Sequence, residues 1–309
     1  MAAIPVVDFH AFRCGSFAER QCVVAQMYQA FHQVGFLYLK SVGMPPGLLE
    51  QMFAQSQQFF QQPLAVKQSL AWSTAICNRG YVAIARERLN PAQPGDLKEA
   101  FNMGRERPRE ANDPTLTNVW PSALPYFRET ALAFYEACTA LVAEILQAMA
   151  LSLRLPSDFW VSRHCQQQHT LRLLHYPPLV NPPDPGQLRA GAHSDYGSIT
   201  LLFQDAIGGL EVQTASGEWT IAPPLADTVL INLGDLMERW TNHTFRSTQH
   251  RVVIPANAAR SRYSIAFFCH PDDEVEVACL EPCQSSSHPP LYPPILAKDY
   301  LLSRLQATY

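Results

Sequence analysis

The segment HSDYGSITLLF, residues 193–203, begins with a candidate metal-binding pair and continues into a short β-rich run. From about residue 168, similar runs follow one another with turn residues between them: HTLRLLHY, GLEVQT, EWTIAP, DTVLINL, HRVVIP and RYSIAFFC. Ala215-Ser216-Gly217, between GLEVQT and EWTIAP, is typical of a hairpin turn. Many short, closely spaced strands predict an antiparallel sandwich, jelly roll or barrel.

The first half of the chain is mostly helical by pattern. Strand-like apolar runs occur at 4–9 and 35–39, and helix-type periodicity occurs at 23–31, 44–63 and 125–156 and again at 295–309. The longest of these patterns, 125–156, places apolar residues from Leu132 to Leu153 on one face. We therefore expect a helical N-terminal part that packs on a β core without a flexible linker.

Composition excludes several classes of protein. Apolar residues make up 47% of the 309 residues and the net charge is −4, so no basic surface for nucleic acid or an anionic membrane is predicted. No charged segment followed by an apolar run opens the chain, and no stretch has the roughly 18–20 uninterrupted apolar residues of a membrane span. Eight scattered cysteines suit free thiols in a reducing compartment. A cytoplasmic protein with a small-molecule partner is the expectation; oligomeric state is not predicted.

The His-x-Asp pair is a candidate iron site. His193 and Asp195 are two residues apart, and on a strand their side chains would share one face. A second such pair at 270–272 has proline between its members at a strand end, where a turn begins. His250 in QHRVV comes far enough along the chain to lie on another strand, although a hydrogen-bonded core histidine is the alternative. Together the three residues have the composition of a 2-His-1-carboxylate triad, which binds Fe(II) and leaves positions open.

The run RYSIAFF suggests what else binds near the metal. Arg262 and Ser264 are two apart on a predicted strand and face the same way. A guanidinium makes two parallel hydrogen bonds to a carboxylate, and a hydroxyl can add a third. Iron beside such an anchor suits a 2-oxoacid, whose distal carboxylate would meet the arginine. Arg260 competes for this role without a hydroxyl partner, and a structural ion pair is the other interpretation of Arg262.

On these motifs the chain resembles the isopenicillin N synthase-like group of iron/2-oxoglutarate-dependent oxygenases. The resemblance runs nearly end to end, through IPVVDF, GFLYLKSVGMPPGLLEQM, QQFFQQPLAVKQ, RGYVAIARERLNPAQPGDLKEAFNMG (79–104), HSDYGSITLLFQD, INLGDLMERWTNHTFRSTQHRVV and RYSIAFF. It implies an α+β fold with a mainly β core, a double-stranded β-helix (jelly roll) flanked by N-terminal helices and a C-terminal helix. It implies a mostly helical region at 1–165, a jelly-roll core at 166–275 and a C-terminal loop and helix at 276–309, as one structural unit.

Carried over by position, the resemblance implies that His193, Asp195 and His250 bind Fe(II). Arg262 and Ser264 would hold the distal carboxylate of the co-substrate 2-oxoglutarate, and dioxygen would take a vacant iron position. Tyr176 matches a tyrosine that bonds the same carboxylate in many members. Where those members have asparagine two residues earlier, this chain has Leu174, so that contact is lost.

Four residues are candidates for the primary substrate or its surroundings: Arg172, Phe101, Trp240 and Phe268. Arg172 is an unusual charge in an apolar run, and either an ion pair at the sheet edge or a contact near the pocket would explain it. The role of the nearby His175 is open. The aromatic residues could line the pocket or belong to the core.

The predicted function is oxidation of a small-molecule metabolite with release of succinate and CO2. Hydroxylation is the usual outcome in the family, and desaturation or cyclisation also occurs. Three alternatives stay open: a 2-oxoglutarate-independent iron oxidase of the isopenicillin N synthase type, an ethylene-forming variant, and a ligand-binding homologue without catalysis. The primary substrate is not predicted, because pocket-lining side chains decide it.

Overall fold

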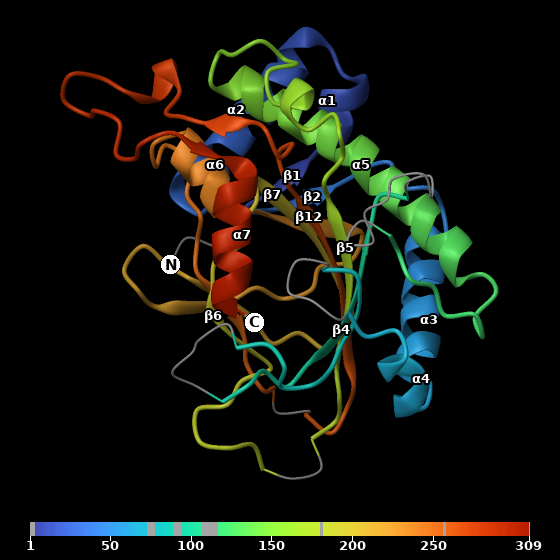
Figure 1. Ribbon diagram of the computed structural model, residues 1–309. Coiled ribbons are helices and arrows are strands. Elements are labelled where there is room, and N and C mark those ends of the chain that lie inside the picture. The colour runs from blue at the N-terminus through green and yellow to red at the C-terminus, as the bar shows by residue number, and fades with distance from the viewer. Residues whose placement is uncertain are drawn as a thin grey trace.

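The computed structural model of this protein describes residues 4–72, 78–88, 94–106, 117–179, 182–255 and 258–308. Within them the expected double-stranded β-helix is present, with helices on its outside (Figure 1). Part of the family-like segment 79–104, residues 89–93, lies outside the described residues.

A major and a minor sheet make up the β core. The major sheet has the order β1-β2-β10-β7-β12-β5-β4-β3, with β1 (Val6–Asp8), β2 (Phe36–Lys40), β3 (Gly80–Val82), β4 (Glu99–Gly104), β5 (Thr170–Tyr176), β7 (Ile199–Gln204), β10 (Thr228–Leu233) and β12 (Arg262–Cys269). The minor sheet has the order β6-β11-β8-β9, with β6 (Ala190–His193), β8 (Leu210–Gln213), β9 (Trp219–Ile221) and β11 (His250–Val252). The predicted hairpin turn joins β8 to β9. A separate pair is formed by β13 (Glu276–Val277) and β14 (Ile295–Leu296).

Helices lie on the outside of the β core (Figure 1). They are α1 (His10–Cys14), α2 (Phe17–Gln33), α3 (Leu48–Phe60), α4 (Leu64–Gln68), α5 (Phe127–Ser152), α6 (Asp235–Trp240) and α7 (Ala297–Thr308). The long α5, green in Figure 1, contacts α2, α3 and β12. Ser16 starts α2 with a capping box, because its hydroxyl and Glu19 satisfy each other's backbone N–H groups.

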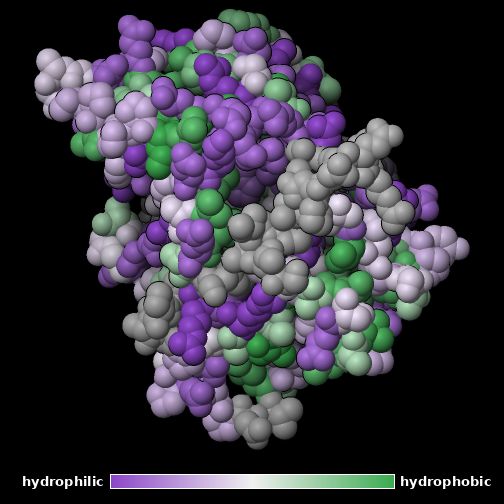
Figure 2. Space-filling model, viewed as in Figure 1, coloured by the Kyte–Doolittle hydropathy of each residue, from purple (hydrophilic) through white to green (hydrophobic). Residues whose placement is uncertain are grey.

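The helix α5 is also the one helix in the described residues that is long and apolar enough to cross a membrane, by length and composition alone. Here it is a core helix, since its buried side chains pack among those of α2, α3 and the major sheet. The face of the molecule seen in Figure 2 is mostly hydrophilic, with separate small hydrophobic patches.

Strand alternation divides the core into two layers. Along β12, Tyr263, Ile265 and Phe267 pack toward the helices, in the larger apolar cluster. The intervening residues Arg262 and Ser264 face the space between the two sheets, together with Ala266 and Phe268. The inner cluster joins residues of both sheets, among them Leu174 of β5 and Val252 of β11. One face of each central strand therefore stabilises the fold, while the other lines a pocket.

Candidate active site

The three predicted iron ligands converge at one end of the pocket between the sheets. Strands β6 and β11 are paired so that His193 lies opposite His250. One donor atom from each histidine and one from Asp195 lie within 4.8 Å of one another. The Asp195 Oδ1 atom is 4.0 Å from His193 Nε2 and 3.8 Å from His250 Nε2.

Strand alternation was predicted to place the side chains of His193 and Asp195 on one face, and that prediction is wrong. Strand β6 ends at His193, so Asp195 lies beyond the strand and strand alternation does not orient it. The backbone after the strand turns instead, and the Asp195 carbonyl accepts a hydrogen bond from the backbone N–H of Asp235 at the start of α6 (2.8 Å). This contact holds the turn that directs the Asp195 carboxylate toward the two imidazoles.

Hydrogen bonds behind the ligands fix how each one presents its donor atom. The Nδ1 atoms of His193 and His250 lie 2.7 and 3.1 Å from the carbonyl oxygens of Gly191 and Thr248. A protonated Nδ1 that donates to a carbonyl leaves the Nε2 lone pair for a metal. The Asp195 carboxylate accepts hydrogen bonds at Oδ2, and its other oxygen, Oδ1, faces the two imidazoles.

The electrostatics favour a divalent cation. Burial lowers the pKa of His193 to about 3, so its imidazole is neutral at physiological pH. Burial alone raises the pKa of Asp195, but His250, His193 and hydrogen bonds from Asn232 and Thr200 outweigh that effect and hold the pKa below its ordinary value. Neutral imidazole nitrogens and one ionised carboxylate oxygen form the donor set that Fe(II) takes in 2-His-1-carboxylate sites. The residues present therefore fit the ion.

Two polar side chains in an otherwise apolar strand layer support Asp195. Thr200 Oγ1 and Asn232 Nδ2 donate to Asp195 Oδ2 at 2.5 and 2.7 Å. We expect the double variant Thr200→Val/Asn232→Leu to bind Fe(II) about tenfold or more weakly, because loss of such supporting bonds costs 10- to 100-fold in metal affinity in other sites. Iron titration of the folded variant measures this. Unchanged affinity would show that the two bonds do not orient the ligand.

The residues predicted to hold the co-substrate lie at the opposite end of the same wall. Arg262 is 1% exposed, yet the described residues provide no carboxylate within ion-pair distance of it. Its guanidinium donates to Gln204 Oε1 at 2.9 Å and to Ser264 Oγ at 3.4 Å, and it stacks on the ring of Tyr176 at 4.6 Å. A buried cation without a protein counter-ion is costly unless an anion pairs with it. The alternative of a structural ion pair for Arg262 was wrong, and Arg260 is exposed.

Comparison with known proteins decides the family. Residues 165–271 match the 2OG-Fe(II) oxygenase superfamily, and residues 4–123 match the N-terminal family of the non-haem dioxygenase in morphine synthesis. A proline hydroxylase of Petromyces alliaceus is 34% identical, with 98% of each chain covered. The chain belongs to the 2-oxoglutarate/Fe(II) oxygenases. A 2-oxoglutarate-dependent dioxygenase of Aspergillus rugulosus is 33% identical, with 91% of each chain covered.

Solved structures of this oxygenase superfamily agree with the fold in detail. A full-length Neurospora crassa protein in complex with alpha-KG (2-oxoglutarate) and thymine superposes with a TM-score of 0.91 at 36% identity, over 99% of this chain and 97% of that one. The complex of the same protein with alpha-KG and 5-formyluracil gives 0.90 at 37% identity, over 99% and 96%. The present chain is thus an Fe(II)- and 2-oxoglutarate-dependent dioxygenase that acts on a small molecule.

Of the four residues predicted to lie at or near the primary substrate, two line the pocket and two do not. Arg172 and Phe268 line the pocket. Phe101 does not: it packs with Phe59 at a ring distance of 4.4 Å in the helix-facing core. Trp240 is likewise in that core, and it was also wrongly predicted. Both side chains fill the apolar layer that supports the sheet, on the side away from the iron ligands.

The two interpretations of Arg172 are both partly correct. Its Nη2 lies 2.7 Å from Glu87 Oε1, so it forms an ion pair, but in the pocket wall and not at a sheet edge. On the opposite face of β5, His175 Nδ1 lies 2.7 Å from Glu99 Oε1 and Nε2 lies 3.1 Å from Ser261 Oγ. That position makes His175 part of a buried structural network.

Several pocket residues were not predicted: Asn78, Glu87, Lys98, Asn102, Tyr196, Asn232, His270 and Leu305 of α7. Some left a signal in the sequence. Asn232 interrupts the apolar run DTVLINL, and Tyr196 directly follows the metal-binding aspartate. Glu87 and Lys98 left no sequence signal beyond their place in the segment 79–104. Their ion pair depends on how that segment folds back on itself.

Proposed function

We propose that this oxygenase oxidises a neutral, planar, polar molecule of the pyrimidine-base class, of which thymine is the simplest candidate. The observation that carries the proposal is the charge balance of the substrate end of the pocket, together with the likeness at 36–37% identity to the Neurospora crassa protein solved with thymine and with 5-formyluracil. Thymine and 5-formyluracil differ in the oxidation state of one exocyclic carbon, so a methyl group on the ring is the proposed site of attack.

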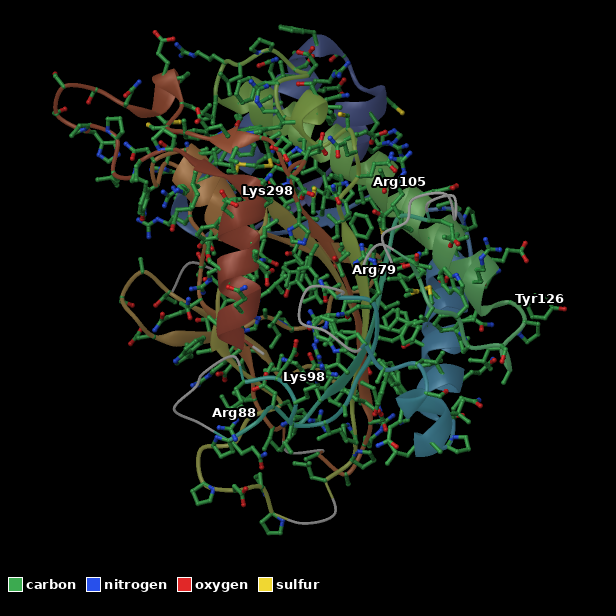
Figure 3. The ribbon with its side chains drawn as sticks, in the orientation of Figure 1. Arg79, Arg88, Lys98, Arg105, Tyr126 and Lys298 are labelled. Carbon is green, nitrogen blue, oxygen red and sulfur yellow. The ribbon has the colours of Figure 1, made fainter. Side chains whose placement is uncertain are left out.

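The buried charged side chains beside the pocket form ion pairs with one another. Lys98 Nζ lies 2.6 Å from Asp96 Oδ2 and 3.2 Å from Glu87 Oε2, and Glu87 also pairs with Arg172. Burial alone lowers the pKa of Lys98, but Glu87 and Asp96 outweigh it and keep the ammonium charged. Figure 3 shows Lys98 in the interior beside β4, whereas Tyr126 lies at the periphery. Among the described residues, two cations are matched by two carboxylates, and this balance favours a neutral substrate over a second carboxylate.

The other surfaces of the pocket suit a flat ring with polar edges. Tyr196 and Phe268 offer aromatic faces, on which planar rings stack. Asn78 and Asn102 offer amide groups, and Asn102 Oδ1 is buried with no hydrogen-bond partner in the part of the chain that the structure describes. A lactam edge, which carries an N–H beside a carbonyl, has the donor that such an acceptor lacks.

The proposed reaction replaces a methyl C–H by C–OH while 2-oxoglutarate and dioxygen become succinate and CO2. Bound ferrous iron supplies the activation of dioxygen. The chain supplies position: Arg262, Ser264 and Tyr176 hold the distal carboxylate, and the register of the sheet sets the distance from there to the metal. Phe268 lies beside Thr200, which holds Asp195, so a ring against Phe268 lies next to the ligands. The buried walls exclude bulk water from this end.

A panel of substrates tests the proposal. Succinate release with Fe(II) and 2-oxoglutarate is measured for thymine, uracil, free proline and an indole carboxylic acid. We expect thymine to stimulate succinate formation above the substrate-free rate and to yield a hydroxymethyl product, whereas the two carboxylate-bearing compounds do not. Stimulation by proline or the indole acid, with none by thymine, would refute the pyrimidine class while leaving the oxygenase chemistry intact.

We also propose a reducing compartment, such as the cytoplasm, for this enzyme. The seven cysteines in the described part of the chain are all free, and four of them are exposed or half-buried. Disulfides are rare where glutathione and thioredoxin keep thiols reduced.

A further inference from the structure

The neutral imidazole of His270 stands in the pocket wall without a role in the reaction described so far. Every second residue of β12 lines the pocket, namely Arg262, Ser264, Ala266 and Phe268, and His270 continues this series past the strand end. Because successive same-face residues on a strand are about 6.6 Å apart, the series leads from the co-substrate carboxylate, past the iron ligands, to the substrate end. His270 is therefore on the far side of the metal from Arg262.

The ring of His270 packs on Gly197 through the edge that carries Nδ1. Its backbone N–H donates to His169 Nδ1 at 3.3 Å. The Nδ1–Cε1 edge packs on Gly197, where a Cβ atom would come within 2.6 Å of Nδ1. The Nδ1 atom is buried, and among the described residues it has no hydrogen-bond partner. Gly197 has an ordinary backbone conformation, so the space taken by His270 is one reason for a glycine at that position.

The opposite edge of the ring faces the cavity. Since one edge packs on Gly197 and the residue lines the pocket, the other edge is the part that a ligand can reach. Turning the ring by 180° about its Cβ–Cγ bond exchanges carbon and nitrogen on both edges, and either orientation places one nitrogen on the cavity side. A polar atom in a buried wall needs a partner.

We propose that His270 is a positioning residue for the primary substrate, and that its cavity-side nitrogen hydrogen-bonds a polar edge of the pyrimidine ring. This inference rests on the proposed function, since the ligand is the same ring. The contact sets which ring carbon faces the iron ligands, because Phe268 restrains only the plane of the ring and a hydrogen bond restrains its rotation in that plane.

The charge state of the imidazole agrees with this role. Burial, with a smaller contribution from His164 and Arg79, lowers the pKa of His270 to about 4. The neutral ring offers one N–H and one lone pair, so it can either donate to a ring carbonyl or accept from a ring N–H.

The test compares His270→Phe, which keeps a flat ring without nitrogen, with His270→Gln, which restores an amide. His10→Phe is the matched control, because His10 is exposed on α1. For His270→Phe we expect the KM for thymine to rise about tenfold or more, the typical effect of losing one hydrogen bond. More succinate should form per thymine oxidised, because a rotated ring is attacked less often. The binding of 2-oxoglutarate, followed by its visible charge-transfer band with Fe(II) in the absence of oxygen, should not change. His270→Gln should recover most of the coupling between the two products, and His10→Phe should behave as the wild type.

Two results would overturn the inference. One is an unchanged KM for thymine and unchanged coupling in His270→Phe. The other is equal damage in both His270 variants together with weaker 2-oxoglutarate binding, which is the signature of a merely structural residue. Failure of the proposed function would look different, because the wild type itself would bind 2-oxoglutarate but oxidise no pyrimidine. That result would also refute the pyrimidine ring as the ligand of His270.

Discussion

The variant Asp195→Asn is expected to lose at least about a hundredfold in Fe(II) affinity, and its turnover is expected to fall to the background rate. Changes behind a metal ligand already cost 10- to 100-fold in other sites, and this change removes the charge of the ligand itself. Asparagine keeps the shape of the side chain, so the hydroxyl of Thr200 can still donate to its carbonyl oxygen. The measurements are iron titration and succinate release.

The second His-x-Asp sequence of the chain provides a matched control for that experiment. Asp272 accepts hydrogen bonds from the backbone N–H of Gln166 (2.9 Å) and from Cys165 Sγ (3.0 Å), and it belongs to no metal-binding group in the described residues. The same substitution, Asp272→Asn, should leave iron affinity and succinate release near the wild-type values. Equal loss of iron in both variants would contradict the assignment of Asp195 as the carboxylate ligand.

Replacing Arg262 by methionine is expected to raise the KM for 2-oxoglutarate roughly a hundredfold. Truncating one partner of a buried, hydrogen-bonded charge pair costs about 3 kcal/mol, and a tenfold change corresponds to about 1.4 kcal/mol. Methionine retains most of the side-chain volume against the ring of Tyr176. The affinity for Fe(II) should stay within about twofold, because the ligands lie at the other end of the wall.

The exposed Arg260 provides a control, because its replacement by methionine removes the same charge outside the pocket. Arg260→Met should keep the KM for 2-oxoglutarate near that of the wild type, although its backbone carbonyl contacts Arg189 (3.2 Å). If the two arginine variants were equally impaired, or if Arg262→Met were unimpaired, the distal carboxylate would bind elsewhere.

Short-range patterns predicted a β-rich core, candidate iron ligands and a candidate arginine anchor, whereas the family resemblance implied the jelly roll and the complete ligand set. Alternation along β12 places Arg262 and Ser264 on one face, and that much follows from the sequence RYSIAFF alone. The prediction for Phe101 failed for a related reason. Strand β4 is buried on both faces, so hydrophobicity does not show which face is turned to the pocket. The structure turns Asn102 toward the pocket and Phe101 toward the helices.

The motif at 270–272 shows a second limit of sequence patterns. Its proline and its place at a strand end argue against a metal site, and His270 nevertheless lines the pocket. Continuing the alternation from Arg262 beyond the strand would have suggested this. The pairing of Glu87 with Lys98 and Arg172 could not have been predicted, because it depends on contacts between segments whose register no local pattern determines.

We propose that this chain couples decarboxylation of 2-oxoglutarate to oxygen insertion into a pyrimidine methyl group. The most direct measurement is turnover of thymine under ¹⁸O₂, with mass analysis of both products. We expect succinate and hydroxymethyluracil in equal amounts, with one oxygen atom from dioxygen in succinate and the other in the hydroxymethyl group. Labelled succinate with unchanged thymine would contradict the assigned substrate, and formation of the hydroxymethyl product without succinate would contradict the assigned co-substrate.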